Sequence, residues 1–401
     1  MTLVDQEPKG GWVVVGACFG ALAVIFGVSY SFAAFFESYA REFSASRADV
    51  SLVFGVSGLL YFLAGAGGGL LADRHGPRIV TSAGMLCIAA ALWVSSQATS
   101  LVHIVLAQGV GVGLGIALVY TPAIGCVQPW FTRRRGLAAG LASAGIGAGT
   151  LVVPVAVAMA IAACQWRTTL QGLAVFVLVA GLAATSLLKR APAATARGTA
   201  AVPGHTLREA MRSPRFRWLY LATVLGAVPM FVPFAHVSAA ARDLGVADAQ
   251  AVGLVGLIGI GSLTGRFAIG GVADHLGRPR TLVLGMAALG ATFVLWLLAS
   301  SLAGSASAVY AVMAVYAVVM GLSYGGIVSL LPALCMDFFG ARAVSSIIGT
   351  LYTGAAFGNL AGPWLAGRLF DVQGNYTTVA LVCLAFGVAA AGCAGRMRRA
   401  A

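Results

Sequence analysis

The sequence predicts an all-α membrane protein with twelve transmembrane helices in two pseudo-symmetric halves of six helices each. Of its 401 residues, 60% are hydrophobic and only 9% are charged, whereas soluble domains carry about 25% charged residues. So few charges cannot cover a water-exposed surface, and most of the chain must therefore lie in lipid. The other two observations are a series of twelve apolar runs and a motif that recurs at half the chain length.

Each apolar run is long enough to cross a bilayer, which takes about 20 helical residues. A stretch rich in Ala, Pro, Thr and Arg at 189–215 reads as a flexible cytoplasmic linker. It separates an N-terminal six-helix half at 1–188 from a C-terminal six-helix half at 216–401. The predicted spans are 11–36, 48–72, 79–97, 102–127, 136–161, 167–188, 217–240, 248–273, 281–300, 307–332, 343–368 and 376–395.

The distribution of basic residues predicts the orientation of these spans. With both termini in the cytoplasm, 19 of the 25 Lys and Arg residues lie on the cytoplasmic side and five on the outer side. This split fits the positive-inside rule. We therefore expect a multi-pass protein of the cell inner membrane with both termini cytoplasmic. The net charge of +13 is dispersed over loops, which argues against a nucleic-acid partner.

A loop motif occurs twice, about half a chain length apart. Residues 68–78, GGLLADRHGPR, resemble residues 270–280, GGVADHLGRPR, and a weaker pair at 130–136 and 338–343 has a similar offset. Such a repeat predicts duplicated halves. In a tight turn, Gly allows positive φ, and Asp can pair with Arg or cap the next helix. The candidate conformational-loop residues are Asp73, Arg74, Gly76, Arg78, Arg133, Arg134, Arg135, Asp274, Gly277 and Arg278.

The paired loop motif, the twelve spans and the central linker resemble the major facilitator superfamily over essentially the whole chain. A narrower resemblance is to the monocarboxylate transporter and oxalate–formate antiporter group. It rests on KGGWVVV (9–15), WFTRRRGLAAGLASAGIGAG (130–149), VPFAHVSAAARDLG (232–245) and an arginine in the eighth span. The superfamily resemblance implies the major facilitator fold and alternating access, with the substrate site between the halves near the bilayer midplane.

That arginine, Arg266, is the main candidate for a substrate ligand. It lies eight residues before Asp274, about 12 Å into a hydrocarbon core roughly 30 Å thick. An arginine facing lipid there is costly, so we expect it to face a watery cavity or a partner. Ser262 keeps the same helix face small and polar, and no Asp or Glu lies in the interior of a span, because all twelve fall in tails, loops or helix ends. A carboxylate substrate, gripped by two parallel hydrogen bonds, would supply the missing counter-ion. The alternative is a structural arginine that snorkels to the cytoplasmic surface or braces a helix carbonyl.

The resemblance implies the substrate role, because members of the group carry a helix 8 arginine that contacts the substrate carboxylate. Oxalate-type exchangers are expected to have a lysine in the eleventh span, where this chain has Gly354 to Ala356. One cation suits one carboxylate. Animal monocarboxylate transporters have a lysine late in the first span and an aspartate one turn before the helix 8 arginine. This chain has Ala34 and Ser262 at those places, which puts the same proton relay in doubt.

Further candidates follow from depth in the spans. Tyr120 lies at nearly the depth of Arg266, where its hydroxyl could bond a carboxylate or its ring could merely pack. His236 lies inside a predicted span, whereas the other histidines lie in loops or, for His103, at the very start of a span. Because histidine titrates near pH 6.5, His236 is the proton-coupling candidate. The alternative for His236 is a neutral side chain bonded to backbone. The remaining candidates for substrate contact are Tyr30, Tyr316, Tyr324 and Tyr352.

These residues predict a secondary transporter of a small monocarboxylate anion such as lactate or pyruvate, acting as a functional monomer in the lipid bilayer. A carboxylate that enters alone opposes the membrane potential by about 2.3 kcal/mol per 100 mV, and symport with one proton removes that cost. An oxalate–formate type exchanger and a transporter-like membrane sensor are the alternatives. The seven cysteines are isolated, and the sequence has no nucleotide-binding loop and no catalytic or metal cluster. It therefore predicts no cofactor, no metal and no enzyme activity.

The orientation can be tested with an Ala200→Cys variant in a background whose seven native cysteines are replaced. We expect no labelling by a membrane-impermeant thiol reagent in intact cells, because the basic linker should be cytoplasmic. A matched Gly304→Cys variant, between the ninth and tenth predicted spans, should be labelled. Labelling of the linker cysteine in intact cells would reverse the proposed topology.

Overall fold

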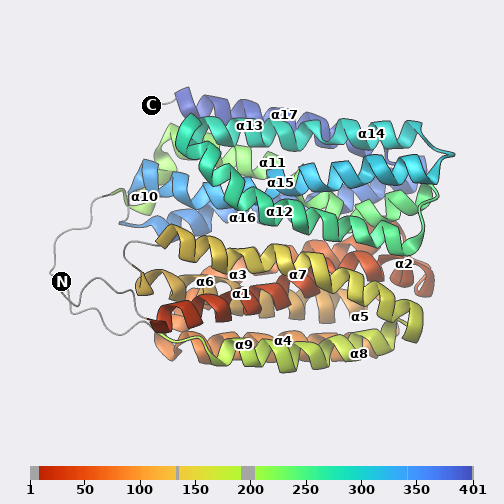
Figure 1. Cartoon of the computed structure of the whole chain (residues 1–401), viewed down its shortest axis with the longest axis horizontal. Helices are drawn as coiled ribbons and strands as arrows, with labels where there is room; N and C mark the ends of the chain where they lie inside the picture. Colours follow the sequence, from red (N-terminus) through yellow and green to blue (C-terminus); the bar gives the residue numbers. More distant parts are fainter. Residues whose placement is uncertain (1–8, 132–134, 191–203, 341, 400–401) are drawn as a thin grey trace.

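The structure, a computed structural model, describes residues 9–131, 135–190, 204–340 and 342–399. Its long helices run along one common axis (Figure 1). The helix α1 (Lys9–Tyr30) begins at the end of the bundle where α17 (Thr377–Arg399) stops and the short α10 (Leu207–Arg212) lies. We call this the terminal end, and the opposite end, where α2 (Phe32–Glu42) lies, the distal end.

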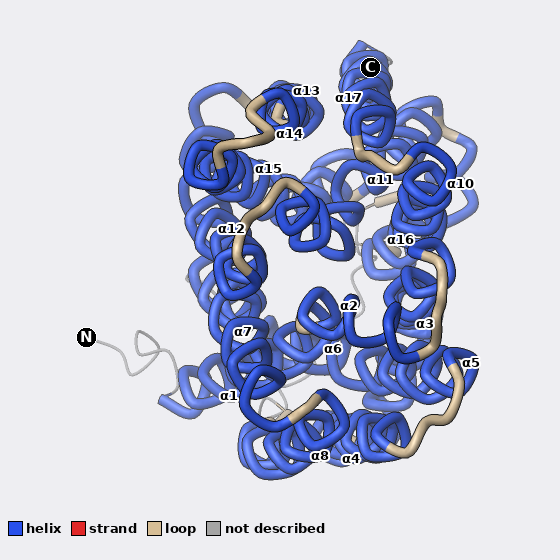
Figure 2. The backbone as a smooth tube through the Cα atoms, turned by 90° about the vertical axis from the view of Figure 1, so that its right-hand side faces the viewer, coloured by secondary structure: helices blue, strands red, loops and turns tan. Residues whose placement is uncertain are grey.

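The helices before the linker gather on one side of the molecule, and those after it gather on the other (Figures 1 and 2). The first group continues with α3 (Arg47–His75), α4 (Pro77–Ser96), α5 (Leu101–Ile104), α6 (Gly113–Val127), α7 (Arg135–Cys164), α8 (Trp166–Phe176) and α9 (Leu182–Ser186). The π-helical turns Val105–Val112 and Val177–Gly181 join α5 to α6 and α8 to α9, and Gln128–Trp130 forms a 3-10 turn after α6. The second group contains α11 (Pro214–Asp243), α12 (Asp248–Leu276), α13 (Arg278–Ala291), α14 (Phe293–Ser301), α15 (Ala306–Phe339) and α16 (Val344–Gln373).

The predicted all-α fold is confirmed, and each of the twelve predicted spans coincides with one helix or with consecutive helices. Over the described residues, eleven of these segments are long and apolar enough to cross a membrane. The segment outside that set is α16, although it has 30 residues. Its sequence is rich in Gly, Ser and Thr and contains Asn359. Because α16 packs against both α3 and α11, its polar groups contact protein rather than lipid.

Two seams join the halves, α7 against α12 and α3 against α16 (Figure 2). A Cβ atom on Gly259 of α12 would lie 2.8 Å from the carbonyl oxygen of Gly147 on α7, so these helices touch through their backbones. On the other seam, the Asn359 amide donates to the carbonyl oxygens of Phe54 and Gly55 at 3.4 and 3.3 Å. These hydrogen bonds join α16 of the second half to α3 of the first half.

The last part of the predicted flexible linker is folded. Thr206 caps α10, because its hydroxyl accepts from the Glu209 backbone N–H at 3.3 Å while the Glu209 carboxylate accepts from the Thr206 N–H at 2.8 Å. These hydrogen bonds lower the pKa of Glu209. The His205 N–H also donates to the Phe339 carbonyl at 2.7 Å. The end of the linker therefore packs where α15 ends. The capping box that folds it cannot be recognised from composition alone.

The repeated loop motif forms the same turn twice. Gly76 and Gly277, aligned in the sequence repeat, have φ of +92° and +82° and separate α3 from α4 and α12 from α13. Arg278 pairs with Asp337 on α15 at 2.6 Å. Arg190 donates to the carbonyl oxygens of Ala72 and Asp73, at the end of α3. Of the other predicted loop residues, Arg74 and Arg78 are exposed, Arg133 and Arg134 lie outside the described residues, and the side chains of Arg135 and Asp274 are likewise not described.

Candidate functional site

Arg266 lies on a segment of α12 that is held tightly by its neighbours. Gly261 and Gly265 bring α12 against the backbone of α15, and Gly259 brings it against α7. Within this packing, Arg266 is only 7% exposed, and Ser262, one turn earlier on the same face, is 1% exposed. The helix contacts therefore fix a guanidinium and a hydroxyl in the interior, as small residues at i−1, i−5 and i−7 allow.

The buried polar atoms of this segment have no partners among the described residues. The Nε and Nη2 atoms of Arg266 make no hydrogen bond, and neither does the Oγ atom of Ser262. A buried charge normally has a counter-ion or several hydrogen bonds, because its desolvation is otherwise uncompensated. A snorkelling arginine would extend to an exposed position at the terminal end, whereas the Arg266 side chain remains buried. The arrangement leaves two N–H donors and a hydroxyl free to bind a small acceptor.

Four of the five predicted tyrosines lie within the electrostatic range of this charge. The Arg266 guanidinium acts electrostatically on the hydroxyl groups of Tyr30 on α1, Tyr120 on α6, Tyr324 on α15 and Tyr352 on α16. Two of these helices belong to each half of the molecule. The site therefore combines one cation with hydroxyl groups from both sides of the interface.

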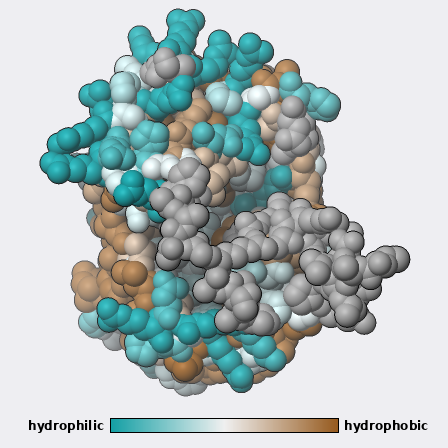
Figure 3. All heavy atoms as spheres, turned by 90° about the vertical axis from the view of Figure 1, so that its left-hand side faces the viewer, coloured by the Kyte–Doolittle hydropathy of each residue, from teal (hydrophilic) through white to brown (hydrophobic). Residues whose placement is uncertain are grey.

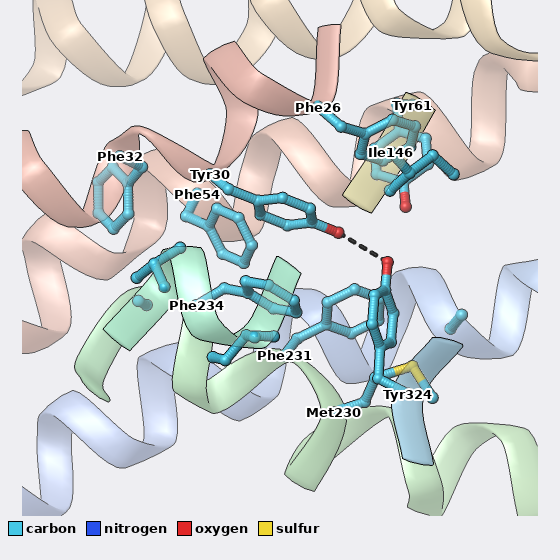
Figure 4. Close-up of a cluster of buried hydrophobic side chains, with 14 of the residues drawn as sticks. Phe26, Tyr30, Phe32, Phe54, Tyr61, Ile146, Met230, Phe231, Phe234 and Tyr324 are labelled. Carbon is cyan, nitrogen blue, oxygen red and sulfur yellow. Dashed lines mark hydrogen bonds between the residues drawn. The ribbon is translucent and has the colours of Figure 1, made fainter. Parts of the chain in front are cut away.

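Tyr30 and Tyr324 make the direct connection between the halves in this region (Figure 4). Their hydroxyl oxygens are 2.9 Å apart, and both residues are buried. The Tyr30 ring stacks on Phe234 of α11 with a centroid distance of 4.0 Å. In this state both hydroxyls are occupied with each other, and the pair closes the space between α1 and α15.

A small cavity lies beside this pair and is walled by both halves. The volume within it that the centre of a water molecule can occupy is about 40 Å³. Tyr120, Tyr324 and Tyr352 line it, whereas Arg266 and Ser262 do not reach its wall. The other walls are mostly apolar and include Phe26, Tyr61, Phe62, Met230 and Phe231, which sequence reasoning missed because no spacing or charge distinguishes them.

The fifth predicted tyrosine lies elsewhere. Tyr316 is fully buried on α15, where its ring packs against Phe293 and Trp296 of α14 with centroid distances of 5.5 and 5.1 Å. It does not line the cavity, and its hydroxyl makes no hydrogen bond with the described residues. Depth along a helix predicted the level of Tyr316 but could not predict the direction in which its ring packs.

A polar network joins the halves at the distal end. Arg47, the first residue of α3, donates two hydrogen bonds to the Asp243 carboxylate at 2.7 and 2.8 Å and a third to the Tyr376 hydroxyl at 2.8 Å. The Asp371 carboxylate accepts from the backbone N–H groups of Arg47 and Ala48, both at 3.0 Å. Arg47 and Ala48 belong to the first half, and the acceptors belong to the second. The sequence analysis did not pair these charges.

His236 belongs to this distal network and lies apart from the cavity. Its Nε2 atom is 2.8 Å from the Pro363 carbonyl oxygen and 3.0 Å from the Ser51 hydroxyl, and its Nδ1 atom is 3.0 Å from the Tyr376 hydroxyl. Because a carbonyl can only accept, Nε2 carries the proton and donates, and Nδ1 accepts from Tyr376. The geometry assigns a neutral imidazole with both nitrogens engaged, the alternative that the sequence left open. We call Arg47, Asp243, Asp371, Tyr376, His236 and Ser51 the distal network.

Comparison with known proteins places the chain in a family. The model of the Major Facilitator Superfamily matches residues 17–363 and 230–399. The chain is 30% identical to monocarboxylate transporter 13 of Bos taurus over 96% of its length and 89% of that protein. It is 31% identical to monocarboxylate transporter 3 of Rattus norvegicus over 93% of its length and 77% of that protein.

A solved structure has the same fold. The inward-facing, occupied form of a bacterial homologue of the human lysosomal transporter Spinster matches with a TM-score of 0.76 and 15% identity, over 99% of this chain and 98% of that one. At this identity the likeness concerns the fold alone. The family model, the apolar helices and this fold agree, and the chain therefore belongs to the major facilitator superfamily of multi-pass membrane transporters.

Proposed function

We propose that the protein carries a small monocarboxylate, such as lactate or pyruvate, together with a proton across the inner membrane by alternating access. One observation carries this proposal: the buried Arg266 has two N–H-bearing nitrogens without partners, next to tyrosine hydroxyls from both halves. Two relatives that match more than nine-tenths of this chain are named monocarboxylate transporters, which supports the same substrate class. A planar carboxylate accepts two parallel hydrogen bonds from a guanidinium.

The neighbouring cavity is compatible with a substrate of a few heavy atoms. Its 40 Å³ of free space is about three times the minimum that a single water needs, roughly 10–15 Å³. Its apolar walls suit a methyl group, whereas the hydroxyls of Tyr120 and Tyr352 suit a 2-hydroxy or 2-oxo oxygen. With one buried cation and no lysine on α16, the site favours a single carboxylate over a dicarboxylate.

The two halves would move relative to each other around this site. The polar contacts between the halves described above all lie in the distal half of the bundle, where Arg47 pairs with Asp243 and Asn359 bonds to α3. The structure is thus closed at the distal end, the end that we assign to the outside of the cell. A carboxylate bound by Arg266 from one half and Tyr30 or Tyr120 from the other would draw the halves together around it.

Proton coupling is assigned to His236 through the distal network. Besides Tyr376 and Ser51, the imidazole interacts electrostatically with Arg47 on α3 and Asp371 on α16, and its ring packs against Phe36 on α2. In the closed state Nδ1 accepts a hydrogen bond from the Tyr376 hydroxyl and therefore carries no proton of its own. A proton bound to Nδ1 while the distal end is open must leave this nitrogen before that hydrogen bond can re-form, so that closing the distal end requires deprotonation of His236.

The function is tested by uptake of radiolabelled carboxylates into proteoliposomes that contain the purified protein. We expect uptake of lactate or pyruvate, stimulation by an acidic exterior, and little uptake of oxalate, because one proton compensates one negative charge. Uptake that requires a counter-anion inside the vesicles would establish the exchanger instead. Binding without flux would establish the sensor.

Removing the buried charge tests the substrate site. Arg266→Ala should fold, melt at or above the wild-type temperature without ligand, and lose the rise in melting temperature that lactate gives the wild type. Arg266→Lys should weaken binding about 10- to 100-fold, because one hydrogen bond to a charged group is worth roughly 1.5–3 kcal/mol. Arg41→Ala, at an exposed distal position, is the control and should keep the ligand effect. An undiminished lactate effect in Arg266→Ala would show that Arg266 does not bind the substrate.

The coupling role of His236 is tested by His236→Gln, with Tyr376→Phe as the matched variant that removes a partner but no titrating group. We expect His236→Gln to abolish stimulation of uptake by an acidic exterior while counterflow exchange continues. Tyr376→Phe should slow both activities and keep the pH dependence. Wild-type pH dependence in His236→Gln would place the proton elsewhere, such as on the bound carboxylic acid.

A further inference from the structure

A groove opens between α13 and α17 at the terminal end of the bundle. The two helices are antiparallel and cross closely at Gly290 and Gly387, where a Cβ atom on Gly290 would lie 2.9 Å from the Gly387 Cα. Toward the terminal end they leave a cavity of about 370 Å³, walled by Val283 on α13 and by residues of α17. The α17 residues are Gly392, Gly395, Arg396, Arg398 and Arg399.

The inner part of this groove is apolar and open toward the side of the bundle. A Cβ atom on Gly392 or Gly395 would meet no other atom within 4 Å, so glycine leaves the space empty at both positions. Next to the groove, Leu284 and Val388 are 56% and 59% exposed. Exposed large apolar side chains on a helix of this apolarity face lipid. The groove is therefore continuous with the lipid-facing surface, along which acyl chains lie.

The mouth of the groove is strongly basic. Arg396, Arg398 and Arg399 are exposed, and none of them forms an ion pair with a carboxylate among the described residues. The Arg396 guanidinium lies over the Trp218 ring, 5.3 Å from the ring centroid, and this contact holds it at the mouth of the groove. The same face of the molecule shows hydrophilic side chains along its upper rim, in the half that contains α13 and α17 (Figure 3).

We propose that this groove binds an anionic phospholipid. The arginines at the mouth contact the phosphate, and an acyl chain lies along Val283, Gly392 and Gly395. Guanidinium groups bind phosphate through paired hydrogen bonds, and basic residues at the membrane surface attract anionic lipids. A free phosphate would leave the apolar wall unused, and a zwitterionic lipid would bring its own ammonium group next to three arginines.

The experiment measures the melting temperature of the purified full-length protein in detergent as defined lipids are added. Phosphatidylglycerol should stabilise the wild type, whereas phosphatidylcholine with the same acyl chains and inorganic phosphate should not. The variant Arg396→Gln/Arg398→Gln/Arg399→Gln should need about tenfold or more phosphatidylglycerol for the same effect. Gly392→Leu should weaken the effect by filling the groove, since the new side chain has open space around it.

Two control variants separate this site from general effects. Arg41→Gln removes an exposed arginine at the distal end, and Gly172→Leu adds a side chain at another glycine with open space on α8. Both should keep the wild-type response. Equal stabilisation by phosphatidylcholine, equal stabilisation by inorganic phosphate, or an undiminished phosphatidylglycerol response in both the triple variant and Gly392→Leu would each overturn the proposal. None of these outcomes depends on transport activity.

Discussion

The central constraint in the interior is a buried guanidinium that has no counter-ion among the described side chains. An arginine side chain in a protein carries a permanent positive charge, so the charge of Arg266 has to be balanced by another group. Its burial is therefore uncompensated until an anion arrives. The tyrosine hydroxyls that surround it provide dipoles but no charge. Because this buried charge is unpaired, we expect the folded protein to bind a small anion at the interface of its two halves.

Glycine makes that interior possible. Along α12, Gly259, Gly261 and Gly265 let two neighbouring helices approach to backbone contact, which fixes the position of Arg266 without bulky side chains. Between the halves the same device places the backbones of α7 and α12 in contact, a surface with little side-chain interdigitation. The rigid support of the charge and the backbone contact between the halves thus follow from one residue type at different positions.

The sequence alone predicted the helices, the two turns with Gly76 and Gly277, and the group of residues around Arg266. Hydropathy and charge determine these features locally, so no knowledge of packing was needed. The distal network could not be predicted, because Arg47, Asp243 and Tyr376 are far apart in the chain and meet only when both halves are assembled. Tyr316 illustrates the same limit, since depth in the membrane leaves the rotation of a helix undetermined. His236 was found by its residue type, but its hydrogen bonds come from two other helices, α3 and α16, and from the segment before α17.

The capping of α3 by Asp371 has a consequence for the solvent. The first N–H groups of a helix need acceptors, and here those of Arg47 and Ala48 are satisfied by a carboxylate from the opposite half, while Ser46 satisfies the N–H of Asp49. In the proposed alternating access, opening of the distal end would withdraw Asp371, and water would have to take its place at the helix terminus and around the separated carboxylate. Opening would therefore also be a hydration reaction. Solutes that are excluded from protein surfaces, such as sucrose, would then shift the balance toward the closed form, so that the proposal makes the resting state depend on the osmotic strength of the surroundings.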